Sequence, residues 1–217
     1  MKEYEVLKNI PPYGNFVAWD KFESIDTKGL RAFGKWFMAE KDNRLQMLFD
    51  EIHRDPEFAN WEPDFSLDSL KSLSNWFKKK LPETYYTEDE FNTLTEVPPE
   101  LKRVKSPDNN FFWITPKYHS LNYDVGIYCG EVLLHELGDR QWEQNMKTSK
   151  NDLYYGQMII QFIPASKYKV VVNPIHIVFN IAVSLYMYHD YRENEIYLIF
   201  HKQLKTLKDR LQSVENE

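Results

Sequence analysis

Cysteine is nearly absent from this chain: Cys129 is the only one in 217 residues. A single cysteine excludes a disulfide framework within the chain, and it fits a compartment in which thiols are kept reduced. The first residues, MKEYEVLKNIPPYG, also lack the apolar core that a signal peptide needs. From these two absences we expect a cytoplasmic protein.

Long apolar runs and concentrated positive charge are missing as well. The longest apolar stretch, near residues 175–188, is interrupted by His176 and Asn180 and is too short to cross a bilayer. Acidic and basic residues are interleaved along the chain and give a net charge of −6, so the sequence has no basic face of the kind that neutralises phosphates. We therefore expect no membrane association and no binding of nucleic acid.

The signature loops of the common cofactor enzymes are also missing. The chain contains no GxxxxGK[ST] loop, no GxGxxG loop, no GxSxG elbow and no CxxC pair. Each of these motifs supplies the backbone or thiol geometry that its cofactor or reaction requires. We therefore predict no cofactor.

Aromatic residues, in contrast, are abundant: 14 Tyr, 14 Phe and 6 Trp stand within a hydrophobic fraction of 42%. Burial of that much apolar surface is what offsets the conformational entropy lost on folding, so we expect a globular chain. A chain of this length can sustain a single core. We predict one compact domain over residues 1–217, with residues 1–60 as a helical portion packed on the rest. The turn-forming residues 104–110, VKSPDNN, are a possible linker.

Hydrophobic periodicity predicts a mainly α fold of the α+β class, with one small antiparallel three-stranded sheet at residues 141–172. Apolar residues at helical spacing indicate helices near residues 28–53, 67–80, 121–137, 174–188 and 193–211, and shorter ones near 88–94 and 98–104. The strand-like runs are residues 140–145, 154–163 and 167–172, which follow one another at the spacing of hairpins.

The run DVGIYCGEVLLHELGDRQW, from Asp124 to Trp142, is the densest in reactive side chains. Gly126 and Gly130 stand four residues apart on its predicted helix, with Tyr128 between them. Each glycine in mid-helix costs roughly 1 kcal/mol relative to alanine, and close approach of a neighbouring segment is the ordinary compensation. We therefore expect this helix to lie in the centre of the fold and its polar residues to have partners.

Glu131 decides how this stretch is interpreted. An unpaired carboxylate that faces the core would be costly, so Glu131 needs a cation, hydrogen bonds or a proton. We favour a structural role, in which Glu131 ties the helix to a loop or to the strand that contains Trp142. The sequence does not rank the candidate cations, which are Arg140, Arg103 and Lys117.

Two catalytic interpretations of the same stretch carry less weight. The segment HELGD, residues 135–139, resembles the zinc motif HExxH, so His135 and Asp139 could share a metal. However, Gly138 interrupts the helix there and no third ligand stands at a suitable spacing, so both are weak candidates and we predict no metal site. Cys129 as a nucleophile would need a base, and it is more simply a small core residue.

Three segments together resemble a loose group of bacterial cytosolic proteins that carry a domain of unknown function. That group has a Ser-Leu-x-x-Leu-x-x-Trp helix, then a Gly-x-Tyr-x-Gly-Glu helix, then a strand with tryptophan. The resemblance covers roughly the middle and C-terminal two-thirds of the chain, and it implies a small accessory or toxin-neutralising protein. The matching residues here are Ser69, Leu70, Leu73, Trp76, Gly126, Tyr128, Gly130, Glu131 and Trp142.

The leading prediction is a non-catalytic protein-binding module, of accessory or immunity type, that presents an acidic and aromatic surface to a protein partner. Tyrosine and tryptophan are the residue types that anchor such interfaces. The alternative is a hydrolase, possibly metal-dependent, that uses Glu131, His135 and Asp139. The chain is either a monomer or a homodimer, and in the second case the face of Gly126 and Gly130 is a candidate contact.

Overall fold

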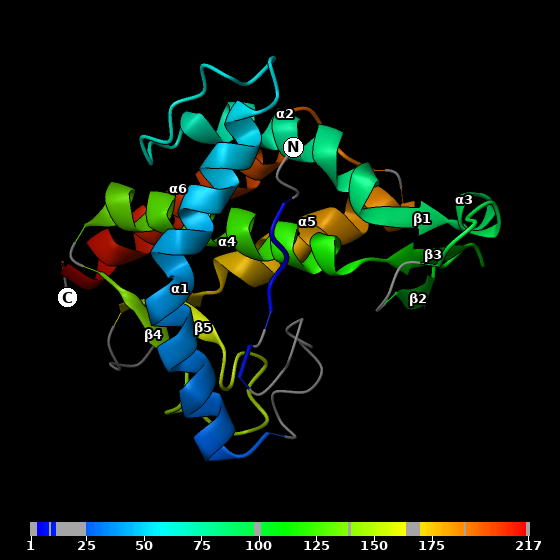
Figure 1. Ribbon diagram of the computed structural model, residues 1–217. Helices are drawn as coiled ribbons and strands as arrows, with labels where there is room; N and C mark the ends of the chain where they lie inside the picture. The colour runs from blue at the N-terminus through cyan, green and yellow to red at the C-terminus, as the bar shows by residue number, and fades with distance from the viewer. Residues whose placement is uncertain are drawn as a thin grey trace.

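The structure is a computed structural model that describes residues 4–8, 10–11, 25–97, 101–138, 140–163, 170–188 and 190–215. Helices dominate it, and two small antiparallel sheets complete the fold (Figure 1). A mainly α fold of the α+β class is therefore confirmed. Its elements in chain order are α1 (Thr27–His53), α2 (Ser69–Lys80), η2 (Leu81–Thr84), β1 (Tyr85–Thr87), α3 (Glu88–Asn92), β2 (Lys102–Lys105), β3 (Phe111–Ile114), α4 (Pro116–Leu137), β4 (Trp142–Gln144), β5 (Met158–Ile163), β6 (Val170–Val172), α5 (Pro174–Tyr188) and α6 (Glu195–Glu215).

Helix α1 begins where its sequence predicts. The Asp26 side chain accepts a hydrogen bond from the Gly29 amide at 2.7 Å and so caps the first turn. The helix is 27 residues long, about 40 Å at 1.5 Å per residue. It crosses the front of the molecule with one face packed on the core and the other open to solvent (Figure 1).

Helix α4 is the central element. It begins at Pro116, five residues before the predicted start, because Thr115 caps it and proline suits the first helical position. It ends at Gly138, whose φ of 59° is the left-handed conformation that a C-terminal glycine adopts at low cost. Most of its residues are buried, and α5 packs along it.

The three-stranded sheet predicted near residues 141–172 is present. Strand β5 lies between β4 and β6, and both pairs are antiparallel. The sequence did not predict a second sheet, in which β3 lies between β1 and β2. This sheet and α3 form a projection, the arm, which comprises the described residues 85–97 and 101–114 and extends to the right in Figure 1.

The short helix predicted near residues 98–104 was wrong over its described part, because residues 102–105 form strand β2. Residues 98–100 lie outside the described residues. The candidate linker at 104–110 includes the turn of a hairpin that joins β2 to β3, with the Ser106 amide donating to the Asn110 carbonyl at 2.9 Å. These residues therefore connect two strands of one sheet.

The buried apolar side chains form one cluster that runs from Tyr4 to Leu207. Of the segment predicted as a helical N-terminal portion, residues 27–53 are helical, while residues 4–8 carry no helix or strand. Residues 1–3, 9 and 12–24 lie outside the described residues. Within the described part of the chain, no helix is long and apolar enough to span a bilayer.

Candidate binding groove

The N-terminal segment, residues 4–8 and 10–11, lies against the body of the protein and is here called the strap. Tyr4, Leu7 and Ile10 are buried, so every third residue of the strap faces the core. The Leu7 amide donates a hydrogen bond to Ser120 Oγ on α4 at 2.8 Å. These contacts fix the strap beside α1 and α4 without any regular secondary structure.

A buried ionic cluster anchors the strap more firmly. Arg44 on α1 donates from Nε and from one terminal nitrogen to the two carboxylate oxygens of Asp124 on α4, at 2.9 and 2.6 Å. Its other terminal nitrogen donates to the Glu5 carbonyl at 2.8 Å, and the Tyr4 hydroxyl donates to Asp124. The fork-shaped guanidinium thus joins α1, α4 and the strap in one hydrogen-bond network.

Burial affects the pKa values of the three ionisable groups in this cluster. Removal from water raises the pKa of the Asp124 carboxyl, although the Arg44 guanidinium beside it acts in the opposite direction. Burial and the neighbouring carboxylate raise the pKa of the Tyr4 hydroxyl well above its usual value, so that this group remains a donor. The pKa of Arg44 is raised despite its own burial, because Asp124 favours its charged form. The cluster is therefore a paired, structural network.

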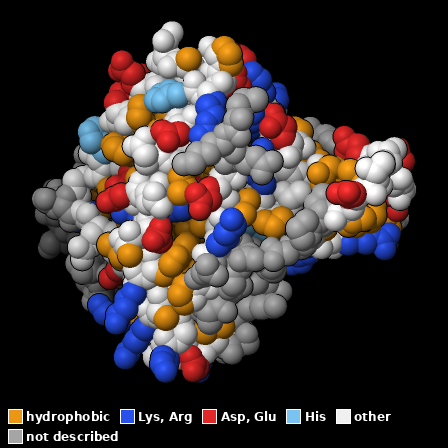
Figure 2. Space-filling model, viewed as in Figure 1, with side chains coloured by type: hydrophobic (Ala, Val, Ile, Leu, Met, Phe, Trp, Pro, Cys, Tyr) orange, Lys and Arg blue, Asp and Glu red, His pale blue; other side chains and the backbone are white. Residues whose placement is uncertain are grey.

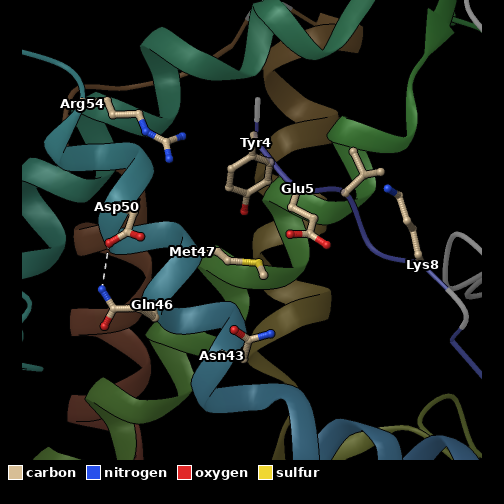
Figure 3. A pocket seen from close by; sticks show the side chains of 9 residues that line it. Tyr4, Glu5, Lys8, Asn43, Gln46, Met47, Asp50 and Arg54 are labelled. Atoms are coloured by element: carbon tan, nitrogen blue, oxygen red, sulfur yellow. Dashed lines mark hydrogen bonds between the residues drawn. The ribbon is translucent and has the colours of Figure 1, made fainter. Parts of the chain in front are cut away.

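A groove of about 430 Å³ opens between the strap and α1. Figure 3 shows the strap residues on one side and the residues of α1, with Arg54 just after it, on the other; the Met47 side chain extends from α1 into the space between them. The volume is within the range of ligand sites, but most of the lining is polar, whereas small-molecule sites are mostly apolar. The nine residues that line the groove are Tyr4, Glu5, Val6, Lys8, Asn43, Gln46, Met47, Asp50 and Arg54.

Carboxylates stand on both walls of the groove: Glu5 on the strap and Asp50 on α1 (Figure 3). Asp50 accepts one hydrogen bond from Gln46 Nε2 at 2.8 Å, which leaves its other oxygen lone pairs available. Arg54 also lines the groove, but its charge is balanced by Glu51 at 2.7 Å. Lys8 on the strap adds a positive charge to the same lining. The two carboxylates that stand opposite each other, Glu5 and Asp50, suit a cationic group that enters between them.

The structure places Glu131 at a different junction. Its Oε1 accepts a hydrogen bond from Trp142 Nε1 at 2.8 Å and lies 2.9 Å from Lys41 Nζ. Glu131 therefore ties α4 to strand β4 and to α1. The cation is Lys41, which was not among the three candidates from the sequence, because only the tertiary structure brings α1 to this point.

The other residues of the motif pack closely. An added Cβ on Gly126 would lie 2.5 Å from the Ile175 Cα of α5, and one on Gly130 would lie 2.0 Å from the Trp142 ring. Both glycines therefore face neighbours within the same chain, so their face is not an open surface for a second copy. Tyr128 is buried, and its hydroxyl lies 2.8 Å from Ser69 Oγ on α2.

Among the residues that the structure describes, those of the hydrolase hypothesis do not come together as a site. Glu131 is already engaged by Lys41 and Trp142, and His135 is exposed. Asp139 lies outside the described residues. Among the described residues, no group of three or more His, Cys, Asp or Glu side chains is placed to hold a metal ion. Cys129 is buried, and burial raises the pKa of its thiol well above the usual value.

Comparison with known proteins gives no further guidance. No family model, curated protein or solved structure matches this chain. The resemblance to the bacterial group therefore stays a prediction.

Sequence reasoning missed the groove and the cluster beneath it. One signal was present: Asp124 is a charged residue within a mainly apolar helical segment, between Tyr123 and Val125, and a buried carboxylate requires a partner. No pattern marks Arg44 or Tyr4 as that partner, because they stand 80 and 120 positions away in the sequence.

Proposed function

We propose that this chain is a non-catalytic protein-binding module of the bacterial cytoplasm, of accessory or immunity type. Its binding site is the groove between the strap and α1, and the partner inserts a lysine or arginine side chain there. The observation that supports this proposal is the pair of carboxylates, Glu5 and Asp50, on opposite walls of a polar groove. An acidic protein of net charge −6 also attracts a basic partner at long range.

The groove favours a side chain of a protein over a free small molecule. More of its lining is polar than apolar, so a small ligand gains limited apolar contact to offset its lost rotational and translational freedom, whereas a protein partner gains further contacts around the rim. Tyr4 and Met47 supply apolar surface for the methylene stem of a lysine or arginine, while the carboxylates receive its charge. The hydrolase alternative is not carried forward, because the Glu131 carboxylate is engaged by Lys41 and Trp142.

A pull-down from bacterial lysate tests the proposal when it compares matched variants. Glu5→Lys reverses the charge of the strap wall at an exposed position, and Glu96→Lys makes the same change at an exposed position on the arm. We expect a stoichiometric partner that the wild type and Glu96→Lys both retain and that Glu5→Lys loses. Quantitative mass spectrometry of the three eluates provides the measurement. Equal recovery by all three proteins would contradict the groove as the binding site.

A further inference from the structure

The solvent face of α1 carries a charge pattern that opposes the helix dipole. Seven exposed residues lie within about 40° of one line along the helix. The last, His53, ends the helix and is a basic residue that suits its C-terminal end, and the other six are Lys28, Lys35, Ala39, Asp42, Gln46 and Asp50. We call these six the α1 stripe. Lysines occupy its N-terminal half and aspartates its C-terminal half. Figure 2 shows Lys and Arg side chains gathered at the lower end of α1, with Asp and Glu side chains above them.

This placement costs stability in the isolated chain. The N-terminus of a helix carries a partial positive charge and its C-terminus a partial negative charge, so lysine is unfavourable in the first turn and aspartate in the last. Helix α1 has no acidic residue in its first turn, and Lys28 stands there instead. Among the residues that the structure describes, Lys28 makes no ion pair that would offset this cost, and Lys35, which stands beyond the first turn, makes no ion pair either.

The outer charges are equally spaced about Ala39, and the inner charges differ by one position. Lys28 and Asp50 each stand eleven positions from it, while Lys35 stands four positions before it and Asp42 three positions after it. At 1.5 Å per residue, the outer charges lie about 16 Å on either side of Ala39 and the inner ones about 5 Å. Met38, beside Ala39, is 52% exposed and is one of the large apolar side chains that the described surface leaves open.

We propose that the α1 stripe binds a second copy of this chain, in an antiparallel pairing of the two α1 helices about a two-fold axis at Ala39. Lys28 of each copy then faces Asp50 of the other, and Lys35 faces Asp42, so four attractive pairs form at once. The exposed Asp42 carboxylate makes its pair in addition to the one with Lys41 of its own chain, at 2.7 Å. The small Ala39 side chains allow the two helices to approach closely at the axis, and Met38 is covered there. A two-fold interface is self-complementary, which is the property that this spacing provides.

Charge reversal tests the pairing. The acidic variant, Lys28→Glu with Lys35→Glu, and the basic variant, Asp42→Lys with Asp50→Lys, each place like charges opposite one another in a homodimer. We expect each to dimerise at least tenfold more weakly than the wild type, and an equimolar mixture of the two to form a heterodimer as tight as the wild-type dimer. Lys28→Glu and Asp50→Lys agree with the helix dipole, so both variants should remain folded. Thermal unfolding of each variant alone verifies this.

Sedimentation at about 10 mM and about 1 M salt, where the screening lengths are about 30 and 3 Å, measures the association. We expect the wild type to move from twice its mass of 26.1 kDa toward the monomer as salt rises. A wild type that is monomeric at low salt, or a mixture of the two variants that stays monomeric, would overturn the proposal. So would a dimer that charge reversal leaves unchanged.

A cross-link locates the axis. The natural Cys129 is buried, so Ala39→Cys introduces the one accessible thiol among the described residues. Facing helices about 8–10 Å apart bring two such residues within disulfide range, and we expect Ala39→Cys to form a covalent dimer on mild oxidation. Gln46→Cys, about 10 Å from the axis, should remain monomeric. The opposite result would overturn the register. This inference concerns self-association and does not rest on the proposed function. Gln46 and Asp50 also line the groove, so the basic variant changes both sites, whereas the acidic variant changes the stripe alone and Glu5→Lys changes the groove alone.

Discussion

At the scale of single residues, the contacts that hold the groove in place are ionic and buried. Asp124 and Arg44 are fully enclosed, and each satisfies the other with two hydrogen bonds. A buried pair of this kind contributes little compared with a well-packed apolar pair, but the loss of one partner leaves an uncompensated charge. A substitution of either charged residue should therefore destabilise the fold, although the two charges are paired in the wild type.

Asp124→Asn should lower the free energy of unfolding by about 3–5 kcal/mol, because Arg44 would remain buried without its counter-charge. Urea denaturation followed by tryptophan fluorescence measures the change. Asp190→Asn removes an exposed carboxylate and serves as the control, with an expected change within about 0.5 kcal/mol. The double variant Asp124→Leu with Arg44→Met should lose less than Asp124→Asn alone. A loss equal to that of the control would show that the pair does not hold α1 to α4.

At the scale of secondary-structure elements, the packing of α4 depends on its two mid-helix glycines. They let the α5 backbone and the Trp142 ring approach to distances that any side chain would block. The consequence is that α4 is fixed both to α5 and to the sheet of β4. Glu131 adds a polar contact at the second of these junctions.

Gly126→Ala should lower the free energy of unfolding by about 1–3 kcal/mol, although alanine is the better helix former. The added Cβ meets the Ile175 Cα, which belongs to the backbone and cannot rotate away. Chemical denaturation of the variant gives this value. Because the obstruction is backbone, truncation of Ile175 to alanine should not rescue the variant. A Gly126→Ala protein as stable as the wild type would show that α4 and α5 can separate at no cost.

At the scale of the whole molecule, the arm is held to the body by one face of its sheet. Phe112 and Ile114 are buried, and Tyr85 and Phe112 pack against the Tyr186 ring of α5, with ring centroids 5.6 and 5.5 Å apart. On the other face, Trp113 stacks on Phe91 of α3, and Arg103 lies over Phe111 at 3.6 Å. The arm therefore carries a small apolar layer of its own in addition to its attachment.

Tyr186→Ala should loosen the arm without a comparable effect on the other sheet. Loss of a buried aromatic anchor lowers the free energy of local opening, and the amides of β3 should then exchange at least about tenfold faster. Hydrogen exchange read by mass spectrometry compares peptides from β3 with peptides from β5. Equal acceleration in both sheets would indicate that the arm and body open together.

Local signals were sufficient for much of the fold. Asp26 before α1, Gly138 after α4 and the Asn173-Pro174 start of α5 each act on the neighbouring turn, so their effect can be inferred from a few adjacent residues. The arm escaped prediction because its strands are only three or four residues long, too short for alternation to show a clear period. The register of the arm's sheet depends on pairing between strands that a turn or a helix separates in the sequence.

By itself, the sequence determined the α+β class, the central place of α4, and the need for a partner at Glu131, because these follow from periodicity, glycine spacing and the cost of a buried charge. Only the tertiary structure decided that Lys41 is that partner, that Arg44 and Tyr4 enclose Asp124, and that a groove opens beside α1. The physical reason is sequence separation. Ionic and hydrogen-bonded contacts between residues 80 or more positions apart depend on how helices pack, and no local pattern encodes that packing.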